Sequence, residues 1–255
     1  MRPPIAALLG LFAITACGGG GGERRGGNQT GASGALPATA APLGRASIAG
    51  TVTFKGVAPA NPSIDMSEEP GCKVKYSMKP HDPVVTVRDG KLADVLVYVK
   101  TGLPAGATPP ARTDPVTLEQ DGCLYHPRVF AVMVNEPIKI VNADPVLHNI
   151  KAVPTVNRGF NISQPTKGME TERAFSQPES AMPLECNVHG WMHAWVFVLP
   201  HPYFAVSGAD GTFAITGLPA GTYTLEAWHQ KLGTRTVTLT VPATGAAPVV
   251  FSFGG

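Results

Sequence analysis

The chain has 255 residues, of which 44% are apolar, and this is enough for one or two domains with their own cores. The formal net charge is only +2 and no basic stripe is present, so nucleic acid is not expected as a partner. Glycines and prolines, 29 and 25 in number, separate short apolar runs. This pattern predicts an all-β protein.

Residues 1–17 are predicted to be an export signal. Arg2 gives a positive start, and the following run "IAALLGLFAITA" is apolar but too short to span a bilayer. The run ends in "ITAC", which looks like a bacterial lipobox, so we expect a lipid on Cys17. The chain would then be anchored to a membrane and face the periplasm, and the absence of Asp after the cysteine favours the outer membrane. The alternative is an ordinary signal peptide cut nearby.

Residues 18–44 are rich in Gly and Ala and cannot build a core, so they are predicted to be a flexible linker. The alternating runs that follow, among them "ASIAGTVTFKG", "LADVLVYVK" and "IKIVNAD", are typical of strands. Asp210-Gly211 marks a tight hairpin turn. No stretch shows sustained helical periodicity, and the region from residue 45 onward is therefore predicted to form β-sandwich structure.

The stretch "CNVHGWM" concentrates metal-binding side chains. Cys186, His189 and Met192 follow the spacing C-x2-H-x2-M, and His148 lies about 40 residues earlier, in "VLHNIKA". A thiolate, two imidazoles and a weak thioether are the ligands of a blue-copper site. Zinc is the main rival metal, although it seldom uses Met. A nucleophilic Cys–His pair lacks a third group to orient it, so no enzymatic activity is expected.

The segments "HNIK" and "CNVHGWM" resemble those of amicyanin and other cupredoxins, and the resemblance covers residues 113–199. It implies a Greek-key β-sandwich with one type 1 copper ion, which would exchange single electrons with a redox partner protein. It also implies that Asn149 ties the strand of the first ligand to the Cys loop by hydrogen bonding. Cupredoxins commonly transfer electrons through an exposed histidine edge in this loop, here that of His189. Trp191 either supplies a docking surface beside that edge or packs inward over the loop.

A second resemblance concerns the end of the chain. "GADGTFAITGLPAGTYTLEAWH" is similar to the signature of carboxypeptidase regulatory-like domains, which are small β-sandwiches. We therefore expect residues 45–112 and 200–255 to form one sandwich with the cupredoxin-like segment 113–199 inserted in it. The alternative is one extended sandwich. The stretches "QDGCLYHPRV" and "HPYFAV" resemble exported proteins of the methylamine-utilisation type.

Two cysteines remain after Cys17 and Cys186 are assigned. Cys72 and Cys123 both lie in Gly-flanked turns, and an exported protein usually pairs its spare thiols, so a disulfide is predicted. Two free thiols are one alternative, and a second metal site of Cys123 and His126 is another. For the whole protein, the alternatives to electron transfer are copper storage or delivery and a binding module in which copper is incidental. Tyr223 and Trp228 could carry such binding, but their strand position favours a place in the core.

Overall fold

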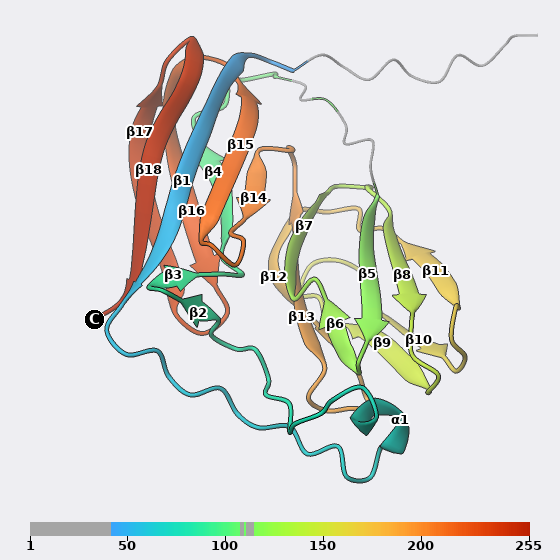
Figure 1. The fold of residues 1–255 in the computed structure, drawn as a ribbon. Coiled ribbons are helices and arrows are strands. Elements are labelled where there is room, and N and C mark those ends of the chain that lie inside the picture. Colours follow the sequence, from blue (N-terminus) through green and yellow to red (C-terminus); the bar gives the residue numbers. More distant parts are fainter. Residues whose placement is uncertain (1–41, 108–109, 111–114) are drawn as a thin grey trace, which may run out of the picture. The chain divides into compact units, whose positions relative to one another are not determined.

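The computed structural model describes residues 42–107, 110 and 115–255, and these form a nearly all-β structure (Figure 1). The fold-class prediction is therefore confirmed. The export signal, Cys17 and nearly all of the linker lie outside the described residues. The one α-helix within the described ranges is α1 (Pro70–Lys73). Among the described residues, no helix has the length and apolar character needed to cross a membrane.

Two sheets come from the two ends of the described chain. The first contains β1 (Arg45–Lys55), β2 (Val87–Arg88), β3 (Lys91–Leu92), β15 (Thr212–Leu218) and β18 (Thr244–Gly254). The second contains β4 (Leu96–Thr101), β14 (Phe204–Val206), β16 (Gly221–His229) and β17 (Gly233–Val241). β1 pairs antiparallel with β15 and, over its whole length, parallel with β18. Alternate residues such as Ile48, Val97 and Tyr223 point between the sheets and make an apolar core.

Two further sheets come from the middle of the chain. One contains β7 (Val129–Met133), β9 (His148–Ala152), β10 (Phe160–Gln164), β12 (Glu179–Glu185) and β13 (His193–Leu199). The other contains β5 (Val116–Asp121), β6 (Leu124–His126), β8 (Ile138–Asn142) and β11 (Glu170–Arg173). β5 pairs in parallel with β8, and β7 with β13, while the other pairs are antiparallel. The second core lies between these sheets and includes Ile140, Ile150 and Leu184.

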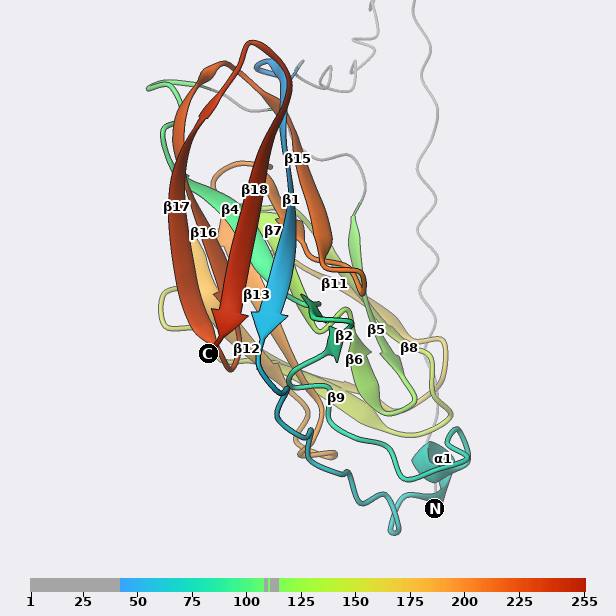
Figure 2. The ribbon, with the colours of Figure 1, turned by 60° about the vertical axis from the view of Figure 1, so that its left-hand side comes forward.

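A third apolar cluster joins the two pairs of sheets. On β13, Val196 and Val198 face the second core, whereas Phe197 faces the other way. Phe197 meets Tyr98 of β4, so an apolar layer also lies between the two pairs of sheets. Figure 2 shows the strands of all four sheets from a second side. No described strand of the first two sheets pairs with one of the other two. Residues Thr39–Gly255 nevertheless group into one compact unit, so the nested pair of domains stays a prediction.

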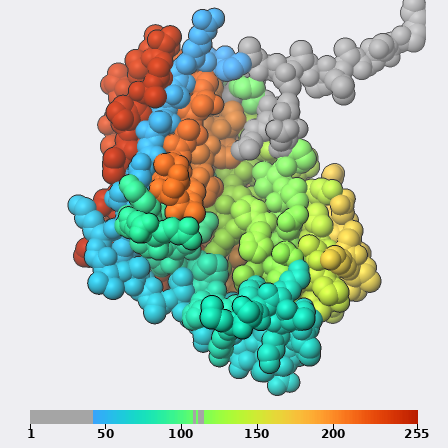
Figure 3. Space-filling view, viewed as in Figure 1, coloured from blue at the N-terminus to red at the C-terminus, as the bar shows by residue number. Residues whose placement is uncertain are grey.

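The segment 57–82 departs from its predicted place. We expected it within the sandwich formed by 45–112, but Ile64, Met66 and Cys72 are buried in the second core. α1 lies at the end of the second sandwich, below β6 and β9 in Figure 1, and Figure 3 shows this segment covering that end. The segment is held there because Cys72 forms a disulfide with Cys123, which immediately precedes β6. The segment therefore packs with the second core, because its apolar side chains are buried there and a disulfide bonds it to a distant turn, although it follows β1 of the first sheet in the chain.

Candidate metal centre

The pairing of β9 with β12 brings the two halves of the candidate site together. Lys151 of β9 lies opposite Glu185 of β12 in antiparallel register. Because paired antiparallel strands run past each other, the start of β9 meets the loop that follows β12. His148 is the first residue of β9, and Cys186 is the first residue after β12. Sequence-distant donors therefore meet at one end of the second sandwich.

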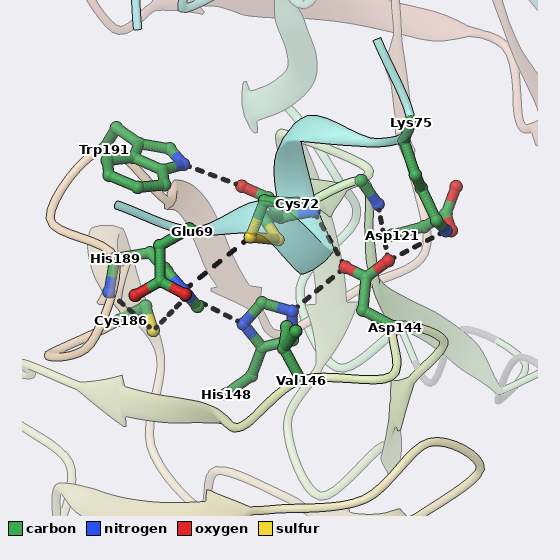
Figure 4. Close-up of a disulfide and its surroundings, with 12 residues drawn as sticks. Glu69, Cys72, Lys75, Asp121, Asp144, Val146, His148, Cys186, His189 and Trp191 are labelled. Atoms are coloured by element: carbon green, nitrogen blue, oxygen red, sulfur yellow. Dashed lines mark hydrogen bonds and ion pairs between the residues drawn. A yellow bond between two sulfur atoms is a disulfide. The ribbon is translucent and has the colours of Figure 1, made fainter. Parts of the chain in front are cut away.

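Three of the four predicted ligands converge there (Figure 4). The Nδ1 atoms of His148 and His189 are 3.0 Å apart, and Cys186 Sγ lies 3.9 Å from His189 Nδ1. One ligand atom from each residue lies within 4.8 Å of the others, and all three side chains are buried. One sulfur and two imidazole nitrogens thus face one buried point.

Asp144 fixes the orientation of the first imidazole. Its Oδ2 lies 3.0 Å from His148 Nε2, and both side chains are fully buried. Burial acts to raise the pKa of Asp144, but hydrogen bonds from His148, Lys75 and the Cys123 amide hold it well below its usual range. The ionised carboxylate accepts a hydrogen bond from Nε2–H, which leaves the Nδ1 lone pair directed at His189 and Cys186. A carboxylate behind a ligating histidine is the usual support of a metal site, so the residues present fit a bound metal ion.

The Cys186 sulfur is prepared as a thiolate. Burial acts to raise its pKa, but the neighbouring His148 and His189 side chains and the Asn149 backbone lower it to about 5. The amide of His189 also points at Sγ, at 3.4 Å. The Asn149 side chain joins the two segments, because its Oδ1 accepts from the amide of Asn187 at 2.6 Å and lies 3.3 Å from Cys186 Sγ. A thiolate is the form that binds soft metals.

The rest of the loop closes tightly on itself. The Met192 amide donates to the His189 carbonyl at 2.9 Å, and the Cys186 amide donates to the Met192 carbonyl at 3.3 Å. Met192 has no exposed surface and belongs to the second core. The half-buried Trp191 donates its indole N–H to the Cys123 carbonyl at 3.0 Å, and its ring centroid lies 5.2 Å from that of His189. The indole therefore packs inward over the loop.

The expectation of an exposed His189 edge is wrong. His189 has 0% exposed surface, because α1 and the disulfide lie against its outer nitrogen. Nε2 is 3.8 Å from Cys72 Sγ and 3.7 Å from Glu69 Oε2. Gly71 lets α1 pack closely against the turn before β9, since a Cβ at Gly71 would lie 2.3 Å from a methyl carbon of Val146. The outer edge of the ring faces protein instead of solvent.

Other predicted residues lie elsewhere. Cys123 is in the disulfide, which removes it from the alternative metal site with the exposed His126. Tyr223 is fully buried in the first core, and Trp228 is half-buried against the cluster between the sheets. Asp144 and Glu69 were not predicted. Asp144 precedes His148 by four residues in a turn, and this spacing could have suggested it, whereas no local pattern connects Glu69 with the loop.

We compared the chain with known proteins by sequence and by structure. No protein-family model matches the chain, nor does any curated protein. Three of the solved structures that it matches are cupredoxin-containing proteins. A Cu-containing nitrite reductase (NirK) from Thermus scotoductus SA-01 is 20% identical, with a TM-score of 0.29 over 38% of this chain and 25% of that one. A purple cupredoxin from Nitrosopumilus maritimus is 20% identical, with a TM-score of 0.29 over 32% of this chain and 98% of that one. A methionine-to-alanine mutant of amicyanin, in its Cu(I) form, is 17% identical, with a TM-score of 0.30 over 40% of this chain and 97% of that one.

Proposed function

We propose that the protein is an exported type 1 copper protein that transfers single electrons. The observation that carries the proposal is the convergence of His148 Nδ1, His189 Nδ1 and Cys186 Sγ in one buried loop region. Copper bound there would supply one-electron chemistry through a thiolate and two imidazoles. Met192 is proposed as the weak axial ligand from its spacing in the loop.

The chain's own residues prepare the site for this role. Asp144 holds His148 in one tautomer, and Asn149 fixes the distance between the β9 end and the Cys loop. Tyr125 adds a further tie, because its hydroxyl donates to the carbonyls of Asn149 and Glu185 at 2.6 and 3.1 Å. Ligands held this rigidly change little between oxidation states, which favours fast electron transfer.

The visible spectrum of copper-loaded protein tests the proposal. Thiolate-to-copper charge transfer should give an intense band, Cys186→Ala should abolish it, and His148→Ala should abolish or strongly shift it. His193→Ala is the matched control, because this half-buried histidine begins β13 only a few residues from His189 and should leave the band unchanged. If Cys186→Ala retains the band, the site assignment is wrong. Met192→Leu should keep the colour and shift the redox potential.

Copper storage or delivery is the second candidate, and one observation favours it. The outer edge of His189 is covered by α1, which leaves no exposed ligand edge at this histidine for a redox partner. The two functions separate on copper exchange. Rapid transfer of copper to a chelator supports delivery, whereas a reversible potential with slow copper release supports electron transfer.

The cellular setting is proposed from the sequence alone. Lipid on Cys17 would anchor the protein to a membrane facing the periplasm, with residues 18–44 as the tether and a redox protein as partner. Cys17→Ser should release the protein into the soluble exported fraction. Membrane association that persists in this variant would point to another anchor. No enzymatic activity is proposed.

A further inference from the structure

A second group of donor atoms surrounds the disulfide. Cys72, Cys123 and His189 each place one ligand atom within 4.8 Å of the others, and all three residues are buried. Cys72 Sγ lies 3.8 Å from His189 Nε2, the ring nitrogen that faces away from Cys186 (Figure 4). The two faces of one imidazole thus meet two different sulfur groups. While Cys72 and Cys123 are joined in the disulfide, neither can offer a thiolate to a metal.

We propose that reduction of this disulfide creates a second copper site, selective for Cu(I), formed by the Cys72 and Cys123 thiolates and His189 Nε2. A dithiol is the reductant: it passes two electrons and two protons to the S–S bond and closes to its own disulfide. Two thiols result, and each loses its proton when it binds the metal. The site goes beyond the proposed electron-transfer role and depends on it only for the choice of copper.

The donor set decides which metal binds. Thiolates are soft ligands and select Cu(I), for which two sulfurs and one imidazole are a sufficient shell. Structural zinc requires a fourth ligand, and the two nearby carboxylates are poorly suited to supply it: Glu69, 3.7 Å from Nε2, is partly exposed, and Asp144 already pairs with His148 and Lys75.

The segment that carries Cys72 is built to open locally. α1 has four residues, and its last residue, Lys73, and the following Val74 are exposed. The segment is held on the second core by Ile64, Met66 and the disulfide, and at its surface by Lys75, which pairs with Asp144, and Tyr76, whose hydroxyl donates to the Gly122 carbonyl. A short helix on a long loop opens at lower free energy than the paired strands, and this gives a small dithiol access to sulfur atoms that are buried in the closed form.

The test isolates the second site by removing the thiolate of the first. In the full chain with Cys186→Ala, Cu(I) affinity is measured by competition with bathocuproine disulfonate, before and after anaerobic reduction with dithiothreitol and its removal. The reduced form should take up about one equivalent of Cu(I) at least about 100-fold more tightly than the disulfide form, since loss of a supporting contact alone costs 10–100-fold. Adding His189→Ala should weaken the reduced site by about tenfold or more.

The matched control is Cys186→Ala with Cys72→Ser and Cys123→Ser, taken through the same reduction. It should show no increase in Cu(I) affinity. The proposal is overturned if the reduced Cys186→Ala protein binds Cu(I) no better than its disulfide form, if it binds only Zn²⁺, or if the serine control gains the same affinity. Failure of the electron-transfer proposal is seen separately, as absence of the charge-transfer band in oxidised protein that retains Cys186.

Discussion

Asp144 accepts a hydrogen bond from the outer nitrogen of His148, with 3.0 Å between Oδ2 and Nε2. The same carboxylate accepts from the amides of Gly122 and Cys123, at 3.0 and 2.7 Å, and forms an ion pair with Lys75 at 2.8 Å. It therefore links the first imidazole to the turn that carries the disulfide. Both the orientation of His148 and the position of the segment that covers His189 depend on one buried carboxylate.

Asp144→Asn should weaken copper binding by about 10–100-fold, because an amide no longer favours the tautomer of His148 that presents Nδ1. Chelator competition measures the affinity, and the visible spectrum reports the ligand set. Asp121→Asn is the matched control, since this half-exposed carboxylate also contacts Lys75 but does not reach His148. Equal losses in the two variants would assign the effect to the Lys75 ion pair.

Trp191→Ala tests whether the indole packs over the loop. Since its N–H donates to the Cys123 carbonyl and its ring lies against His189, we expect a shifted spectrum, faster copper loss and a free energy of unfolding lower by about 1–3 kcal/mol. Trp191→Phe keeps a ring and loses only the hydrogen bond, so its cost should be about 1 kcal/mol. An undisturbed spectrum with a slower electron self-exchange rate would instead support a docking role.

The sequence predicts the strands and the meeting of His148, Cys186 and His189 better than their surroundings. Alternation identified the strands because it reports which face of each strand is buried, and the spacing from Cys186 to Met192 is local. The cover over His189 could not be predicted, since segment 57–82 has no periodicity and reaches the site through contacts distant in sequence. Only the spare Cys72 suggested such a contact. Asp144 was not predicted, because its role depends on the turn that orients it toward His148.

Removal of the disulfide should lower the stability of the metal-free protein. The bond between Cys72 and Cys123 spans 51 residues. In the chain-entropy model a loop of this length contributes about 4 kcal/mol, so Cys72→Ala with Cys123→Ala should lose roughly that amount in urea unfolding. Peptide mapping without reductant should find the two cysteines joined in the wild type. Two alkylatable thiols at these positions would contradict the disulfide.

Glu179 should make stability fall at acid pH. Burial acts to raise its pKa, but hydrogen bonds from Asn157 and Thr155 lower it from 4.5 to about 2. A carboxylate with a depressed folded-state pKa stabilises the fold fully above pH 4.5, and this contribution is lost as the pH falls toward 2. Urea unfolding over this range should show a loss of about 2 kcal/mol that is absent in Glu179→Gln. Glu172→Gln, at an exposed position on β11, should keep the wild-type profile.

The contact between the two pairs of sheets can be tested at Phe197. Its side chain is 1% exposed, and its ring centroid lies 5.8 Å from that of Tyr98 and 5.1 Å from that of Trp228. Phe197→Ala should cost about 3–5 kcal/mol, because it leaves a cavity between layers that share no strand pairing among the described residues.

If the chain contains a cupredoxin-like domain nested in a second sandwich, this cavity should also uncouple them. Calorimetry of Phe197→Ala should then show two transitions, of which only one shifts when copper is bound. Val198→Ala is the matched control. Val198 is next to Phe197 in the chain, but its side chain faces the second core, so the variant should be destabilised without any split of the transition. A single transition in Phe197→Ala, shifted as a whole by copper, would favour one extended sandwich, because both halves would then unfold as one cooperative unit.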